Sequence, residues 1–119
     1  MNAAARVRTS VAPGQVLDFI QPRLENALRQ RKRYRYVQPQ VLHERGQYRI
    51  QSPCCSRNVD KEGGLIDIAL LVPPSEHSEL WSLYARNHQA AVWELHQSNS
   101  QLQALLNLVC VDAQRLFWP

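Results

Sequence analysis

The chain has 119 residues, of which 45% are hydrophobic and 20% are charged, and its formal net charge at pH 7 is +4. This length fits one domain with a single core, and this composition excludes an intrinsically disordered chain. No apolar stretch is long enough to span a bilayer and no secretory signal is visible, so we expect a cytoplasmic protein.

The positive charge is concentrated in the first part of the chain. Residues 1–49 hold ten Lys and Arg residues against three acids, whereas residues 50–119 hold four against seven. Residues 1–12 include Arg6 and Arg8 and no acid. We expect residues 1–12 to form a flexible N-terminal arm and residues 13–119 to form a single domain.

An amphipathic helix is predicted between Gln15 and Gln30. Its apolar residues recur at three- and four-residue spacing, which places them on one buried face. Pro22 lies inside this stretch and predicts either a kink or a helix that begins near Phe19. The apolar positions are Val16, Phe19, Ile20, Leu24, Ala27 and Leu28.

A basic segment with interleaved tyrosines follows this helix, over residues 29–36. Arginines neutralise phosphates and tyrosine rings stack on unpaired bases, so this pattern is typical of contact with single-stranded nucleic acid. The alternative is a solvated helix end, where cations offset the negative end of the helix dipole. The segment contains Arg29, Arg31, Lys32, Arg33, Tyr34, Arg35 and Tyr36.

A β-hairpin is predicted next, with the turn ERGQ at residues 44–47. Apolar and polar residues alternate with period two on both sides of this turn. Pro39 indicates an edge strand, because proline cannot donate a hydrogen bond to a neighbouring strand. A polar loop follows at residues 52–64, in which Arg57 and Asn58 are the predicted recognition groups.

Three further strands are predicted in the second half of the chain. The apolar run LIDIALLV at 65–72 predicts a central strand, which Pro73 and Pro74 end. The aromatic stretches at 80–86 and 91–96 predict two more strands joined by a short turn.

A closing helix is predicted after these strands. Ser98 or Ser100 would cap it, and leucines between Leu102 and Leu108 would form its apolar stripe. We expect the sequence Leu116-Phe117-Trp118 beyond this helix to dock into the core.

The order of helix, about five antiparallel strands and helix predicts an α+β fold in which the helices cover one face of the sheet. The strings YVQPQV, GQYRI, IDIALL, WSLYARN, VWELH and DAQRLFWP occur in this layout. In these strings and their order, the chain resembles a family of small uncharacterised bacterial proteins that is classed as a domain of unknown function. The resemblance covers most of the chain, and it implies a fold but no activity and no functional residue.

Asp67 interrupts the apolar central strand. Strand alternation places it on the face that carries Ala69 and Leu71, where an unpaired carboxylate would be costly. If the following strand folds back near residue 76, Arg86 or Tyr84 comes close to Asp67. We predict an ion pair with Arg86.

A functional alternative for Asp67 is a metal site. The string GGLIDIAL is similar to the glycine-preceded Ile-Asp strand of the PD-D/ExK nucleases, which implies a magnesium ion between Asp67 and a nearby acid. The next strand, WSLYARN, has no acid, so Glu94, one strand further on, would have to serve.

The cysteines and histidines give no clear site. Three cysteines without a CxxC spacing support neither a disulfide framework nor a zinc site, and the four histidines lack metal-ligand spacing. Whether Cys54 or Cys55 is a reactive thiol stays open.

These patterns predict a small non-enzymatic binding or accessory protein that needs no cofactor. It would contact nucleic acid or an acidic protein surface through the basic segment and the loop at Arg57 and Asn58. Homodimerisation through the aromatic strands is compatible with this function. The alternative is a divergent metal-dependent nuclease centred on Asp67, with Glu94 or Glu25 as the second acid.

Overall fold

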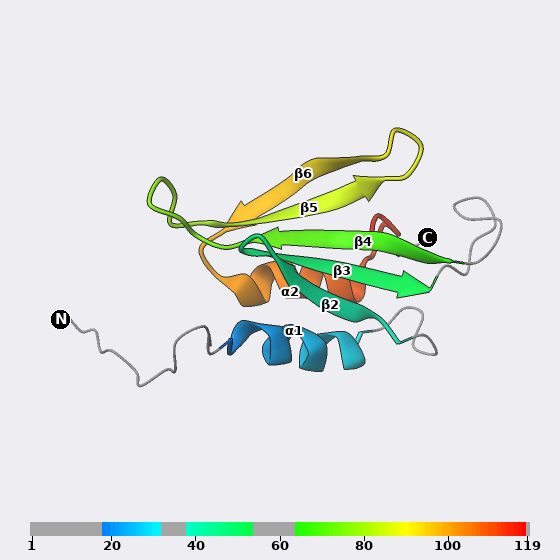
Figure 1. Ribbon diagram of the computed structural model, residues 1–119, viewed down its shortest axis with the longest axis horizontal. Coiled ribbons are helices and arrows are strands. Elements are labelled where there is room, and N and C mark those ends of the chain that lie inside the picture. The colour runs from blue at the N-terminus through cyan, green and yellow to red at the C-terminus, as the bar shows by residue number, and fades with distance from the viewer. Residues whose placement is uncertain (1–17, 32–37, 54–63, 119) are drawn as a thin grey trace.

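The computed structural model describes residues 18–31, 38–53 and 64–118, which form two helices and one five-stranded sheet (Figure 1). The sheet is antiparallel, and its strands lie side by side in chain order. The predicted α+β fold is confirmed. The elements are α1 (Ile20–Arg29), β2 (Gln40–Glu44), β3 (Gln47–Pro53), β4 (Leu65–Val72), β5 (Trp81–Asn87), β6 (Val92–Asn99) and α2 (Leu102–Val111).

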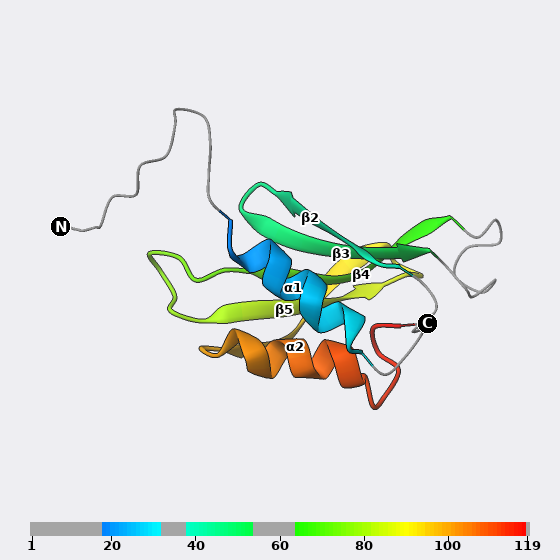
Figure 2. The same cartoon turned by 90° about the horizontal axis from the view of Figure 1, so that it is seen from below.

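Both helices lie against the same face of the sheet, as Figure 2 shows from below. The hydrophobic core fills the space between the helices and this face. Burial of this apolar surface is the main favourable contribution to folding. The side chains that meet in the core include Leu24 and Leu28 of α1, Ile50, Leu71 and Leu83 of the strands, and Leu105, Leu106 and Val109 of α2.

Helix α1 begins at Ile20, which confirms the predicted start near Phe19. Pro22 therefore lies in the first turn, where its missing N–H removes no intrahelical hydrogen bond. The carboxylate of Asp18 accepts hydrogen bonds from the N–H groups of Ile20 (2.9 Å) and Gln21 (3.1 Å). The carboxylate thereby provides an acceptor for two of the backbone N–H groups that have no partner within the helix at its N-terminus.

Asp18 also connects α1 to the sheet. The Tyr48 hydroxyl donates a hydrogen bond to Asp18 Oδ1 (3.1 Å), and His43 Nδ1 lies 2.8 Å from Asp18 Oδ2. The rings of His43 and Tyr48 stack with centroids 4.2 Å apart. Burial and the hydrogen bond to Asp18 raise the pKa of Tyr48 to about 12, so its hydroxyl keeps its proton at neutral pH.

Replacing Asp18 with alanine is expected to lower stability at pH 7 by about 1–2 kcal/mol. Burial raises the pKa of Asp18, but the N–H groups of Gln21 and Ile20, the Tyr48 hydroxyl and His43 together lower it below 3.8. A carboxylate with a lowered folded pKa stabilises above its unfolded pKa and loses this effect as pH falls through the folded value. The difference between wild type and Asp18→Ala, measured by urea unfolding, should therefore narrow as the pH falls below the ordinary aspartate pKa of 3.8.

An exposed acid remote from α1 provides the control for this experiment. Glu76→Ala changes the same net charge at the turn between β4 and β5, where Glu76 is exposed. It should leave the unfolding midpoint nearly unchanged at pH 7. A stability difference for Asp18→Ala that stays constant from pH 7 to the acid range would contradict the assigned role of the carboxylate.

The strand predictions hold closely. β4 spans Leu65–Val72 as predicted and is the central strand of the five. β2 begins directly after Pro39 and is an edge strand, paired only with β3 in the described part of the chain. β5 and β6 end one and three residues later than predicted, at Asn87 and Asn99.

The prediction that Asp67 lies on the same face of the sheet as Ala69 and Leu71 was wrong, because β4 contains a β-bulge. Ile50 lies opposite Ala69, but the next residue of β3, Gln51, lies opposite Asp67, so Ile68 is an extra residue. A bulge shifts the alternation of side chains by one position. Ile68 and Ala69 therefore both face the core, and Asp67 faces away from the helices.

The C-terminal end of the chain differs from its prediction in one respect. Neither Ser98 nor Ser100 caps α2, because β6 continues to Asn99 and Ser98 pairs with Ser82. The Asn99 side chain instead accepts the Gln101 N–H (2.8 Å) just before the helix.

The predicted docking of the last residues is confirmed for two of them. Phe117 and Trp118 are 3% and 1% exposed, whereas Leu116 is 43% exposed. The indole N–H of Trp118 donates to the carbonyl of Val109 (2.9 Å), so the ring is buried with its polar atom satisfied. This docking extends the core beyond the end of α2.

Candidate functional site

The face of the sheet that points away from the helices is the candidate site. No helix or strand among residues 18–31, 38–53 and 64–118 covers it. Side chains of directly paired residues in antiparallel strands share a face, so the register assigns its members. We call it the open face; it carries Gln40, Leu42 and Glu44 of β2, Gln47, Arg49 and Gln51 of β3, Asp67 and Leu70 of β4, Tyr84 and Arg86 of β5, and Trp93 and Leu95 of β6.

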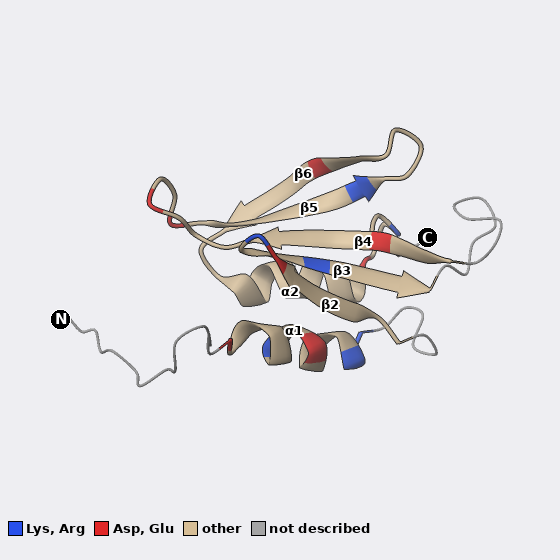
Figure 3. Ribbon diagram, in the orientation of Figure 1, with Lys and Arg blue, Asp and Glu red and all other residues tan. Residues whose placement is uncertain are grey.

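Asp67 lies between two arginines on this face. Arg49 Nε is 3.6 Å from Asp67 Oδ1, Arg86 Nε is 3.8 Å from Asp67 Oδ2, and the Gln51 amide donates to Oδ1 at 3.0 Å. The predicted ion pair with Arg86 is confirmed, and Arg49 and Gln51 are additional partners. Figure 3 shows this alternation as basic, acidic and basic positions on β3, β4 and β5.

The two arginines carry more positive charge than Asp67 compensates. Both distances to Asp67 exceed hydrogen-bonding length, so the contacts are electrostatic and leave N–H groups of the guanidinium ions available. Arg49 Nη2 also lies 3.2 Å from Glu44 Oε1, which forms a second ion pair. The side chains of Arg49 and Arg86 are 33% and 21% exposed, which leaves them accessible from the open face.

An aromatic ring adjoins Arg86. Its guanidinium carbon lies 5.1 Å from the centroid of a Trp93 ring, within the range of a cation–π contact. Burial lowers the pKa of the nearby His88; Arg86 lowers it further, while Asp67 opposes both effects. A neutral imidazole, a guanidinium and an indole therefore meet at the β5 and β6 end of the open face.

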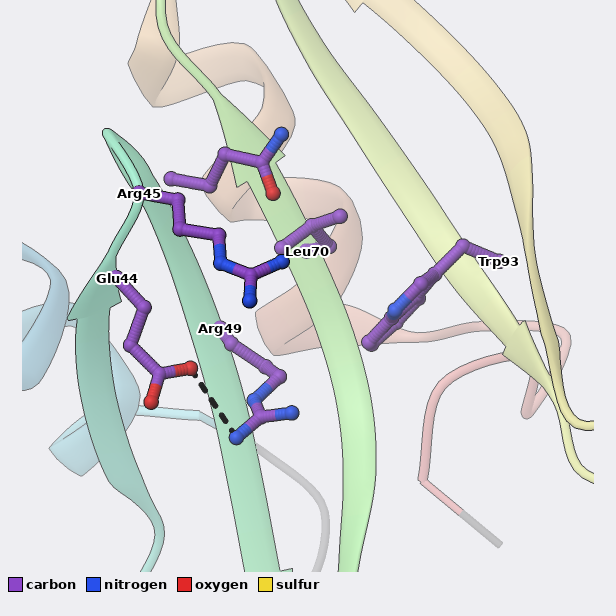
Figure 4. Close-up of a pocket in the computed structure, with 6 residues that line it drawn as sticks. Glu44, Arg45, Arg49, Leu70 and Trp93 are labelled. Carbon is purple, nitrogen blue, oxygen red and sulfur yellow. Dashed lines mark ion pairs between the residues drawn. The ribbon is translucent and has the colours of Figure 1, made fainter.

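A pocket of about 410 Å³ opens between the β2–β3 turn and Trp93 (Figure 4). Leu70 is 9% exposed and supplies an apolar wall. Figure 4 shows the Arg45 side chain extending from the turn toward this pocket, with Trp93 on the opposite side. The lining residues are Glu44, Arg45, Gln47, Arg49, Leu70 and Trp93.

The turn that presents Arg45 has a defined geometry. Glu44 pairs with Gln47, so Arg45 and Gly46 form a two-residue hairpin loop. Their φ angles are +53° and +73°. Two consecutive positive φ angles are typical of the type I′ turn, in which Asn-Gly is the preferred pair. Arg45 therefore occupies a backbone conformation that disfavours arginine.

The basic segment lies largely outside the described residues. Arg29 is exposed and donates to Asn26 (2.6 Å) at the end of α1. Arg31 is only 3% exposed, donates to the Leu28 carbonyl (2.7 Å) and lies 4.7 Å from a Trp118 ring. Arg31 is therefore buried, and the prediction that it is an exposed binding residue was wrong. Lys32, Arg33, Tyr34, Arg35, Tyr36, Cys54, Cys55, Arg57 and Asn58 lie outside the described residues.

The metal site proposed for the nuclease alternative is not assembled. Glu94 lies opposite Ala85, a core residue, so it is on the other face of the sheet from Asp67. Glu94 instead accepts a hydrogen bond from Asn87 (3.1 Å). Two arginines beside Asp67 would also repel a divalent cation. Among the described residues, no three His, Cys, Asp or Glu side chains are grouped as metal ligands would be.

Sequence reasoning assigned none of the six lining residues to a site. A signal for part of this set was present, since Gln47, Arg49 and Gln51 alternate with the buried Tyr48 and Ile50. That alternation predicts a polar row on the outer face of β3. Trp93 could not be placed in the same way, because its position depends on the register of three strands.

Comparisons with known proteins give a single result. A family model described as Domain of unknown function (DUF3024) matches residues 14–119 of the chain. No curated protein and no solved structure matches it. Within the described residues, no helix combines the length and apolar character that crossing a membrane requires.

Proposed function

We propose that this chain, which belongs to the family of the Domain of unknown function (DUF3024), is a non-enzymatic binding protein that holds single-stranded nucleic acid on the open face of its sheet. The observation that carries this proposal is the combination of Arg49, Arg86, Tyr84 and Trp93 on one accessible sheet face. Guanidinium groups neutralise phosphates, and aromatic rings stack on unpaired bases.

The shape of this face favours a single strand over a duplex. A flat or gently twisted sheet presents rings side by side, which unstacked bases can meet but paired bases cannot. The basic segment at residues 29–36 precedes β2 in the chain, and its cations other than the buried Arg31 would add to the long-range attraction of a polyanion. An acidic protein partner would use the charges but would have no need of the rings.

Arg86→Gln is expected to weaken binding of a fluorescein-labelled single-stranded RNA of about ten nucleotides by about fivefold. The reason is the loss of one phosphate contact. The slope of log K against log salt should accordingly become shallower by about 0.7. Fluorescence anisotropy over a range of salt concentrations measures both quantities.

Arg23→Gln is the matched control, because Arg23 is exposed on α1 and lies on the helical side of the molecule. It removes the same charge and should leave affinity and salt slope within twofold of wild type. Equal effects of the two variants would show that binding depends on net charge alone. Equal competition by polyglutamate and by unlabelled RNA would indicate an acidic protein partner and reject the nucleic-acid assignment.

A further inference from the structure

We infer that the pocket between the β2–β3 turn and Trp93 is a subsite for one guanine base of the bound strand. This inference rests on the proposed function, because the base would come from a strand held on the open face. It adds a sequence preference to a surface that would otherwise bind any single strand. Three features of the pocket support it.

The walls of the pocket suit a planar ring. Trp93 lines it on one side and Leu70 supplies a second apolar surface. Stacking on an indole is a general mode of binding unpaired bases. The cation–π contact with Arg86, at 5.1 Å, holds the Trp93 ring in place. The volume of about 410 Å³ lies within the range of small-ligand sites.

The polar groups of the pocket match the edge of guanine. Glu44 supplies a carboxylate, which only accepts hydrogen bonds, and Arg45 and Arg49 supply guanidinium groups, which only donate. Guanine has two adjacent donors, N1–H and the N2 amino group, which together fit one carboxylate. It also has two acceptors, O6 and N7, which fit an arginine.

The other bases lack this combination. Adenine and cytosine each present an unprotonated ring nitrogen beside their amino group, and that lone pair would face the Glu44 carboxylate. Uracil has a single N–H between two carbonyl oxygens. Arg49 Nη2 lies 3.2 Å from Glu44 Oε1, and because each carboxylate oxygen can accept two hydrogen bonds, both oxygens can still accept from the base.

The backbone at Arg45 is the third and independent observation. An arginine at φ +53° costs about 1 kcal/mol relative to a conformation that it prefers. Asparagine would fit this position of a type I′ turn better. Backbone strain that persists despite a simple alternative is concentrated at functional sites. Here it places a guanidinium beside the pocket.

The test uses the full chain and oligouridine strands of about ten nucleotides that carry G, A, C or U at one central position. The strand with G is expected to bind about tenfold more tightly than the other three. Glu44→Gln should reduce this preference to less than about twofold. It should leave affinity for the all-uridine strand equal or higher, because Arg49 loses a carboxylate neighbour.

A second variant separates function from folding. Arg45→Asn should raise the melting temperature by about 3 °C, because it relieves the turn, and should weaken binding of the G strand. Arg23→Gln, which removes the same charge at an exposed site on α1, is the matched control and should change neither quantity. A purely structural role for Arg45 would not produce higher stability together with weaker binding.

The outcomes distinguish the two proposals. Salt-dependent binding of all four strands with equal affinity would overturn the guanine subsite and leave the proposed function standing. A preference for G that survives Glu44→Gln would also overturn it. If no strand binds, both proposals fail.

Discussion

Replacing Asp112 with alanine is expected to lower the free energy of unfolding by about 4 kcal/mol. The Asp112 carboxylate accepts the backbone N–H groups of Leu116 (2.6 Å), Phe117 (3.2 Å) and Trp118 (2.9 Å). Asp112 itself is 3% exposed, so these donors would be left without an acceptor near the core. Each unsatisfied buried donor costs about 1–3 kcal/mol.

The backbone adds to this cost. Asp112 ends α2 with φ +45°, a left-handed conformation that aspartate and asparagine tolerate better than alanine. Asp112→Asn keeps this tolerance and one side-chain oxygen, so it should cost about half as much. Urea unfolding followed by tryptophan fluorescence measures the loss, with the buried Trp118 as one reporter.

The same experiment tests how Arg31 is held. Trp118 packs against Arg31 only while the last residues are docked. Release of this segment should expose the guanidinium and increase nonspecific binding to nucleic acid. An unfolding midpoint for Asp112→Ala equal to that of wild type would show that the carboxylate does not hold the C-terminal segment.

Replacing Asp67 with alanine has the second largest expected effect, a loss of about 2 kcal/mol. The change leaves Arg49 and Arg86 without the carboxylate between them and removes the acceptor of the Gln51 amide. Asp67 is 17% exposed, so the cost falls between that of a surface pair and that of a fully buried one. High salt should reduce the loss, because it screens the repulsion between the two arginines.

Two further variants identify the cause. Asp67→Asn keeps an oxygen for Gln51 and removes only the charge, so it isolates the electrostatic part of the loss. Glu94→Ala changes an exposed acid on the opposite face and should cost less than about 0.5 kcal/mol. Magnesium should not stabilise the wild-type protein, and a rise in its melting temperature on adding magnesium would restore the metal interpretation of Asp67.

Asp67→Asn also predicts a functional gain. The carboxylate competes with phosphates for Arg49 and Arg86, so its neutralisation should strengthen RNA binding while it weakens the fold. The Asp67 carboxylate therefore stabilises the fold but opposes binding, and its neutralisation should change stability and affinity in opposite directions.

Much of the fold follows from local patterns in the sequence. The helix that buries Leu24 and Leu28, the central strand from Leu65 to Val72 and the edge strand after Pro39 were all predicted. These features depend on residues that are neighbours in the chain, such as a three- to four-residue apolar spacing or a proline without an N–H. The ion pair of Asp67 with Arg86 was also predicted, from a chain reversal near residue 76, although the face predicted for Asp67 was wrong.

The candidate site depended on contacts between distant parts of the chain. The sequence by itself determined that Asp67 needs a partner and that residues 44–47, which include Arg45, form a turn. Only the tertiary structure decided that the bulge at Ile68 turns Asp67 to the open face, and that Trp93 reaches the pocket beside that turn. A shift of one residue in strand register moves a side chain to the other face, and that shift is set by packing across the whole sheet. The burial of Arg31 against Trp118 has the same origin, because helix docking brings together residues from opposite ends of the domain.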